Sequence, residues 1–440
     1  MTAPEIPIVP RGQARDAKRA PRLDGLRGYL ALGVIVVHVA FAAGIIGFYD
    51  VPGQGIWATL SQGLHVLLPP FFVMSGLLLY KPFAKATIGG TAQPAMRPYL
   101  LRRALRILPA YWLVALASVL LLNFNAIDGI WYVLRPLLTV HVYWTYGQTI
   151  AGMEPTWTVP AEIAFYIALP LLAWLGKSFA KGATDPGQRA RRLAVPLLLL
   201  VVVAMVWTIY SHRPEMGPFP DEYFWVFGFT AFLAIGMVLA IMMAHYEVTG
   251  REPALFRAAR RHPLWFWAGA LALYLVNCVR PLGKPGMSDY GDVPEALVEQ
   301  LVFLPFAFLI IVPVIVPDVR SRFLDAVLAN APMRYFGRIS YGVYLWHFVL
   351  QYLWLQSGSI FGEDPQPMPM LIGRAGFWEL LAAVLIGTVI VASISYYAVE
   401  LPAMRLRNKL AKSTRELDVP RQEPLVSVGS TPVRPGDRVG

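Results

Sequence analysis

The residues most able to do chemistry in this chain are Arg27 and His38, which are joined by a nearly uninterrupted apolar stretch. On a helix, their separation of eleven positions corresponds to a rise of about 16 Å. If Arg27 lies at a membrane surface, His38 lies near the middle of a hydrocarbon layer roughly 30 Å thick. An ionisable side chain at that depth is costly and is by default a candidate for function. Because an imidazole can act as a general base near neutral pH, we predict that His38 is catalytic.

A histidine that acts as a base needs a partner that fixes its tautomer. The best acidic candidate is Glu162, in an apolar segment that we expect to enter the membrane from the outer side, and we predict that it is the second catalytic residue. A structural hydrogen bond to a neighbouring helix is the alternative interpretation of Glu162. His347 also lies within an apolar segment, where a substrate-binding role and a structural role are both open.

Several arginines gather where apolar segments meet the predicted inner membrane surface, namely Arg27, Arg102, Arg103 and Arg106. One interpretation is topology control and contact with lipid headgroups. The other is recognition of a phosphorylated ligand, because guanidinium groups match the geometry of phosphate oxygens. Arg103 and Arg106 lie three positions apart, on one helical face, which favours a shared anion. We therefore predict that Arg27, Arg103 and Arg106 bind the phosphates of a co-substrate.

Pro69 and Pro70 interrupt the second apolar segment shortly before Ser75. A helix that is broken at membrane depth is tolerated where it lines a cavity. Ser75 therefore joins the candidate substrate-binding residues, although the sequence places no evident base beside it and a packing role is open. Aromatic residues that could line the path of the acceptor, or serve instead as interfacial anchors, are Trp157, Tyr166, Tyr341 and Tyr344.

The composition places these residues in a membrane. Of 440 residues, 56% are hydrophobic and 15% are charged, and no soluble protein of this size needs so much apolar surface. We therefore predict an all-α polytopic protein of the cell (plasma) membrane, surrounded by lipids. The net charge is +11, and the charged residues cluster between the apolar segments. This distribution indicates topology control and not nucleic-acid binding. The single cysteine, Cys278, excludes an internal disulfide and a multi-cysteine metal site, and we predict no bound metal.

Ten apolar segments are long enough to span a membrane. Their approximate limits are 26–46, 56–80, 108–124, 158–176, 194–211, 224–244, 263–279, 297–317, 338–356 and 376–399. The connections alternate between basic and acidic, which the positive-inside rule explains if both termini are cytoplasmic. We expect residues 23–407 to form one ten-helix core, with an interfacial or re-entrant piece at 125–157 and disordered cytoplasmic tails at 1–22 and 408–440.

Six sequence blocks resemble the acyltransferase-3 family of integral-membrane acyltransferases. In order, they are RLDGLRGYLALGVIVVH, FFVMSG, RRALRILPAYW, WTVPAEIAFYIALP, GRISYGVYLWH and VELP, and they extend from about residue 22 to residue 407. One block alone is weak, whereas six in the family's order are specific. The chain departs from the family at Leu401, where members often have an arginine, and it ends before the extracytoplasmic hydrolase-like domain that some members carry.

The resemblance implies a ten-helix core that transfers an acyl group from cytoplasmic acyl-CoA to an acceptor facing the other side. Residues at the positions of the family's motifs are Arg27 with His38, Arg103 with Arg106, Glu162, His347, and Phe71, Phe72, Ser75 and Gly76. The resulting hypothesis is a membrane O-acyltransferase that uses acyl-CoA, with acetyl-CoA favoured, and acylates a hydroxyl of an outward-facing envelope glycolipid or glycan. His38 acts as a general base or, in a rival route, as an acyl-histidine.

Other functions remain open on the sequence. The acceptor of the same reaction could be a small secondary metabolite. Polar residues at the membrane midplane and a broken helix are also typical of transporters, so export or flipping of a lipid-linked sugar is a second class of function. The apparent lack of inverted repeats counts against a transporter, and the intact set of motif residues counts against a scaffold that has lost the chemistry.

Overall fold

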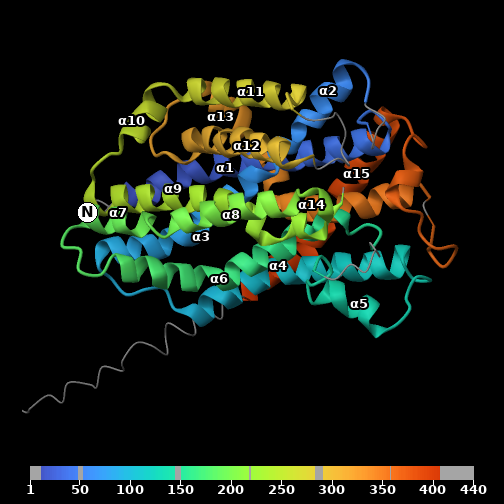
Figure 1. Cartoon of the computed structure of the whole chain (residues 1–440), viewed down its shortest axis with the longest axis horizontal. Helices are drawn as coiled ribbons and strands as arrows, with labels where there is room; N and C mark the ends of the chain where they lie inside the picture. The colour runs from blue at the N-terminus through green and yellow to red at the C-terminus, as the bar shows by residue number, and fades with distance from the viewer. Residues whose placement is uncertain are drawn as a thin grey trace, which may run out of the picture.

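The computed structural model describes residues 11–47, 53–143, 150–217, 220–282, 291–356 and 358–406, and these form helices and turns without a β-strand (Figure 1). The α-helices are α1 (Arg11–Ala42), α2 (Gly55–Gly63), α3 (Pro69–Gly89), α4 (Met96–Ala117), α5 (Ile130–Leu137), α6 (Thr158–Phe179), α7 (Pro186–Ala194), α8 (Leu197–Ser211), α9 (Thr230–Thr249), α10 (Ala254–Arg261), α11 (Pro263–Val279), α12 (Val293–Ile315), α13 (Arg322–Leu328), α14 (Ala331–Trp354) and α15 (Phe377–Ser395). Two 3₁₀ turns matter for the site, η1 (Leu64–Leu67) and η3 (Glu154–Trp157).

Most of these helices are long and apolar enough to cross a membrane. Eight stretches qualify in the described parts of the chain, and α10 with α11 adds a ninth if this pair, bent by 90°, is one span. α14 has 24 residues, or about 36 Å of helix, and matches the predicted span 338–356, although Arg334, Arg338 and His347 make it more polar. Each predicted span coincides with a helix, so the prediction of an all-α multi-pass membrane protein is confirmed.

The directions of neighbouring helices agree with the predicted order of crossings. α1 and α14, the first and ninth spans, run parallel, because His38 meets His347 toward one end and Asp24 meets Gly337 toward the other. α14 and α15, the ninth and tenth spans, run antiparallel. A miscount of one crossing between α1 and α14 would have made that pair antiparallel. Figure 1 shows the long helices side by side, with α7 and α10 near one end of the bundle and α2 and α5 near the other.

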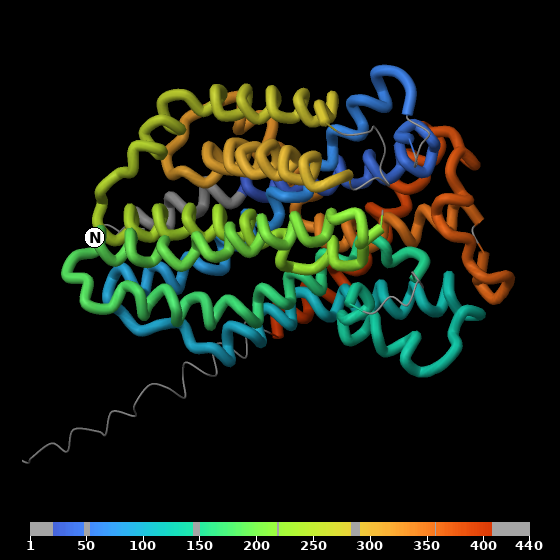
Figure 2. Tube along the Cα trace, viewed as in Figure 1, coloured from blue at the N-terminus to red at the C-terminus, as the bar shows by residue number. Residues whose placement is uncertain are grey.

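Glycines allow α1 to approach α14 so closely that backbones touch. A Cβ atom added to Gly337 would lie 1.7 Å from the carbonyl oxygen of Asp24, and one added to Gly28 would lie 2.6 Å from that of Met333. Gly236 lets α9 approach α3 in the same way. Lipid provides little hydrophobic force between helices, so small residues that permit close packing hold such pairs together. In Figure 2 the paired helices α1 (blue) and α14 (orange) come from nearly opposite ends of the chain.

The second predicted span is broken, as its proline pair indicates. α2 ends at Gly63, η1 follows, and α3 begins at Pro69. Proline suits the first turn of a helix because the backbone N–H that it lacks would have no partner there. The break places side chains of η1 and the start of α3 along a cavity, which is the situation in which a broken helix is tolerated at depth.

The structure can be compared with the predictions for two segments outside the spans, residues 1–22 and residues 125–157. α1 begins at Arg11, so the second half of the segment 1–22, predicted to be disordered, is helical, and Arg22 forms a 2.7 Å ion pair with Asp325. Residues 1–10 and 407–440 lie outside the described residues. Within 125–157 the described residues form α5, η3 and turns, and none of these elements is long enough by itself to cross a membrane.

Candidate active site

α1 carries both residues of the predicted chemical pair in one continuous helix. Arg27 and His38 are therefore separated by the expected rise of about 16 Å. The imidazole of His38 is half-buried, and the ring of Phe348 packs edge-on against it, with 4.8 Å between ring centroids and an interplanar angle of 86°. The backbone of α1 thus sets the depth of the imidazole, and α14 restricts its rotation.

A second histidine holds His38. Nδ1 of His38 lies 2.9 Å from Nε2 of His347, and Nδ1 of His347 lies 2.6 Å from the carbonyl oxygen of Tyr344. Because a carbonyl oxygen only accepts, Nδ1 of His347 must carry a proton. In the neutral ring, Nε2 of His347 then accepts a hydrogen bond from Nδ1–H of His38, an assignment that follows from the network. Nε2 of His38 is left with its lone pair available.

This pair replaces the predicted one between His38 and Glu162. Glu162 accepts hydrogen bonds from Ser75 at 3.2 Å and from Tyr166 at 2.6 Å. Its carboxylate is therefore directed to α3 and to the next turn of α6, and the prediction that it orients His38 is wrong. His347, predicted to bind substrate, is fully buried behind His38 and takes the orienting position instead.

Glu162 belongs to a polar group on the predicted cytoplasmic side of His38, which we call the inner cluster. Its members are Arg27, Arg103, Arg106, Ser75, Glu162, Tyr166 and Tyr341. Arg27 and Arg106 both interact electrostatically with Glu162, and Arg103 interacts with Tyr166. The predicted arginines from α1 and α4 therefore converge, although they are far apart in sequence.

One hydrogen bond ties the inner cluster to α14. The hydroxyl of Tyr341 donates to the carbonyl oxygen of Ile107 at 3.1 Å, which attaches α14 to the helix that carries Arg103 and Arg106. Arg106 is exposed, and Glu162 is only half-buried. The cluster is thus accessible from outside the packed core, as a binding site for a charged ligand must be.

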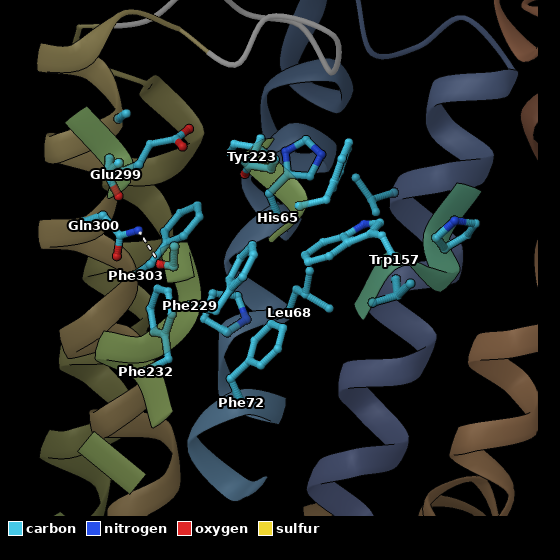
Figure 3. A pocket seen from close by; sticks show the side chains of 18 of the residues that line it. His65, Leu68, Phe72, Trp157, Tyr223, Phe229, Phe232, Glu299, Gln300 and Phe303 are labelled. Carbon is cyan, nitrogen blue, oxygen red and sulfur yellow. Dashed lines mark hydrogen bonds between the residues drawn. The ribbon is translucent and has the colours of Figure 1, made fainter. Parts of the chain in front are cut away.

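A cavity of about 200 Å³, which we call the outer cavity, lies beside His38 (Figure 3). His38 lines it together with many aromatic side chains. The indole of Trp157 packs against Phe229, with 4.9 Å between ring centroids, and faces Phe72 at 6.4 Å. Figure 3 shows Glu299 and Gln300 on the opposite side from Trp157. The cavity therefore combines an aromatic body, a polar wall and the candidate base.

A hydrogen-bonded pair separates the outer cavity from the inner cluster. The hydroxyls of Tyr344 and Thr158 lie 2.8 Å apart, and Tyr344 also donates to the carbonyl oxygen of Pro155. Tyr344 is one helical turn from Tyr341, and Thr158 is one turn from Glu162. This pair joins α14 to the start of α6 at the level where the two regions meet.

The predicted acceptor-path residues fall into two groups. Trp157 and Tyr344 line the outer cavity. Tyr166 and Tyr341 lie in the inner cluster instead, so their assignment to the acceptor path is not what the geometry shows, and the candidate substrate-binding residue Ser75 lies there with them. Tyr166 is eight positions into α6, about 12 Å beyond its first residue, which moves it past the level of His38 toward the arginines.

Sequence reasoning missed a group of polar residues on the wall of the outer cavity. Arg280, Glu299 and Gln300 line it, and so does His65. Polar residues inside an apolar span are a signal of function, and Glu299 and Gln300 lie within the apolar helix α12. Their position near the end of the span made them resemble ordinary boundary residues.

The comparison of sequences defines the class of protein. The profile described as an acyltransferase domain, that of the acyltransferase-3 family, matches residues 21–397, so the chain belongs to this family of acyltransferases. No solved structure matches the chain significantly.

The relatives that match include named acetyltransferases. Putative peptidoglycan O-acetyltransferase YrhL of Bacillus subtilis (strain 168) is 25% identical over 400 residues, covering 87% of this chain and 54% of the relative. Peptidoglycan O-acetyltransferase OatA of Listeria monocytogenes is 22% identical over 405 residues, covering 88% and 56%. Nodulation protein 10 of Rhizobium leguminosarum bv. viciae is 22% identical over 362 residues, covering 77% and 82%. The chain thus spans about half the length of the two peptidoglycan O-acetyltransferases.

Proposed function

We propose that the protein is a membrane O-acyltransferase that moves an acyl group, preferentially acetyl, from cytoplasmic acyl-CoA to a hydroxyl of an outward-facing envelope glycolipid or glycan. The observation that carries the proposal is the hydrogen-bonded series from the Tyr344 carbonyl through His347 to His38. It leaves a free imidazole lone pair at the wall of the outer cavity. Family membership and the names of two relatives support the type of reaction.

The inner cluster is the proposed donor site. The phosphates of acyl-CoA bind Arg103, Arg106 and Arg27 through charge-assisted hydrogen bonds. The extended pantetheine arm then follows α1 over the rise of about 16 Å that separates Arg27 from His38. Glu162 supplies countercharge to Arg27 and Arg106, so the phosphates compete with a carboxylate that is already in place.

His38 acts on the acceptor hydroxyl. The hydroxyl oxygen attacks the thioester carbonyl carbon while Nε2 of His38 takes its proton. His347 stabilises the imidazolium through the bond to Nδ1 of His38. The C–S bond then breaks, His38 returns the proton to the departing sulfur, and the products are an O-acyl ester and free CoA. Positioned base catalysis of this kind contributes about 10²–10⁴-fold to a rate.

The test is acetyl transfer by purified protein in detergent, with radiolabelled acetyl-CoA and an envelope lipid and glycan extract as acceptor. His38→Ala is expected to lower the rate by about 10²–10⁴-fold while acetyl-CoA binding persists. His262→Ala, in the connection between α10 and α11, is the matched control and is expected to retain activity. Full activity of His38→Ala would contradict the base role.

The same assay separates the proposal from transport. A transferase turns over without a sealed membrane, whereas a flippase produces no labelled product in micelles. Wild-type protein that binds acetyl-CoA but transfers nothing to the extract would contradict the proposed reaction. Mass spectrometry of the labelled product identifies the acyl group and the acceptor together.

A further inference from the structure

We infer that the outer cavity selects acceptor units that donate hydrogen bonds and carry no negative charge, and that Glu299 and Gln300 set this preference. The inference rests on the proposed function, because it takes the cavity beside His38 to be the acceptor site. The chemical class of the bound unit is a neutral or amino-bearing polyhydroxylated ring.

The size and the walls of the outer cavity fit a single ring. Its volume of about 200 Å³ is smaller than the roughly 300–1,000 Å³ of sites that enclose drug-sized ligands. Trp157 and Phe229 present flat apolar faces on one side, against which the C–H face of a sugar ring can pack. Glu299 and Gln300 lie on α12 on the side opposite Trp157 (Figure 3), where they can receive the hydroxyl groups at the rim of the ring.

Gln300 has an unused acceptor. Its Oε1 atom is buried and receives no hydrogen bond from the described residues, while its Nε2 lies 3.5 Å from the carbonyl oxygen of Gly228. A buried polar atom without a partner is rare and calls for an explanation. A hydroxyl of a ligand in the outer cavity would provide the missing donor.

The charges at the cavity wall disfavour an anion. The guanidinium of Arg280 is shared by two carboxylates, Glu295 at 2.5 Å and Glu299 at 3.2 Å. Arg280 is the one arginine or lysine among the described residues that line the cavity. Glu299 lines the cavity itself, and the guanidinium is already engaged by both carboxylates, so the described lining residues present no unopposed positive charge to a ligand. A phosphate or carboxylate group on the acceptor would be repelled, whereas hydroxyl and ammonium groups would be accommodated.

A thiol placed in the cavity tests the charge preference directly. Ala296 lines the cavity one helical turn before Gln300, and the full-length Ala296→Cys variant in micelles is treated with a cationic trimethylammonium or an anionic sulfonate methanethiosulfonate reagent. After correction for reaction with free cysteine, the cationic reagent is expected to react about tenfold faster or more, since charges a few ångströms apart interact by more than the 1.4 kcal/mol of a factor of ten. The parent chain, whose Cys278 is buried, provides the baseline.

Variants of the wall sharpen this test. Glu299→Gln in the Ala296→Cys background is expected to bring the corrected ratio close to one. Methyl β-glucoside is expected to protect the introduced thiol from labelling more strongly than methyl β-glucuronide does. Gln300→Leu is expected to remove the protection by methyl β-glucoside. Leu301→Ala is the matched control, because Leu301 is the next residue of α12 and is 71% exposed.

Each outcome bears on the inference separately from the proposed function, because labelling needs no acyl-CoA. Equal corrected rates, equal protection by both glycosides, protection that survives Gln300→Leu, or a thiol that no reagent reaches would overturn the inference even if acetyl transfer is intact. A clear cation and neutral-sugar preference in a protein that transfers no acetyl group would support the binding preference and contradict the proposed reaction.

Discussion

The inner cluster and the outer cavity lie on either side of His38 and differ in kind. The inner cluster gathers three arginines from α1 and α4 around the carboxylate of Glu162. The outer cavity is mainly aromatic, and its one arginine, among the described lining residues, is engaged by two glutamates. Guanidinium groups at accessible positions suit a polyanion, whereas aromatic faces with hydrogen-bond acceptors suit an uncharged ring. The asymmetry suggests that each region binds a different substrate of one reaction.

The two regions share a helix. Tyr341, Tyr344 and His347 of α14 lie three positions apart, so they follow one another along the same face. Tyr341 contacts α4 within the inner cluster, Tyr344 bonds Thr158 at the boundary, and His347 bonds His38 at the outer cavity. The position of α14 therefore sets the geometry of both regions together.

The largest expected effect comes from separating α14 from α1, which breaks both regions at once. Gly337→Ala places a methyl group 1.7 Å from the Asp24 carbonyl oxygen, a distance at which the backbones must move apart. We expect loss of folded protein, measured as the monodisperse fraction in gel filtration, and loss of acetyl transfer. Gly376→Ala is the control, because nothing lies within 4 Å of its added Cβ, and an equal effect of both substitutions would contradict the packing argument.

The next largest effect is expected from a substitution that disturbs the outer region and leaves the inner cluster intact. His347→Ala removes the acceptor for Nδ1–H of His38, and a hydrogen bond to a charged group is worth about 1.5–3 kcal/mol, so kcat should fall by about 10- to 100-fold. The KM for acetyl-CoA should stay unchanged, because the inner cluster is intact. His347→Gln should recover part of kcat, since its amide oxygen can accept the same bond. A loss confined to KM would argue against an orienting role.

The inner region should respond in the opposite way. Arg103→Ala and Arg106→Ala each remove a proposed phosphate contact, so the KM for acetyl-CoA should rise by about tenfold while kcat changes little. Arg97→Ala is the matched control, because Arg97 is an exposed arginine in the first turn of the same helix. An unchanged KM accompanied only by lower expression would favour topology control as the role of these arginines.

The smallest effect is expected at the boundary. Thr158→Val keeps the shape of the side chain but removes its 2.8 Å hydrogen bond with Tyr344, which also bonds Pro155. One neutral hydrogen bond contributes about 0.5–1.5 kcal/mol, so kcat/KM should change by about tenfold or less. Steady-state kinetics measure this change. A loss as large as that of His347→Ala would show that the boundary pair takes part in orienting His38.

Helix bounds and the positions of residues along each helix could be predicted from the sequence. Hydropathy marks approximately where a helix starts and ends, and a rise of 1.5 Å per residue converts sequence separation into distance along the helix axis, so the separation of Arg27 and His38 along α1 was predicted correctly. The proline pair before Ser75 correctly indicated a broken span beside a cavity. The basic connections indicated an order of crossings that the parallel packing of α1 and α14 matches.

Lateral neighbours were decided only by the tertiary structure. Glu162 and His38 both lie inside spans, but depth does not say which face of α6 meets which helix, and Glu162 turns to Ser75 and Tyr166. The pairing of His38 with His347 depends on backbone contact between α1 and α14, more than 300 residues apart. Hydropathy and helical rise are properties of one helix at a time, whereas contact between helices depends on how side chains of both fit together. The chain alone thus determined the helices and the position of the imidazole along its helix, and packing decided its partner and the cavity that it faces.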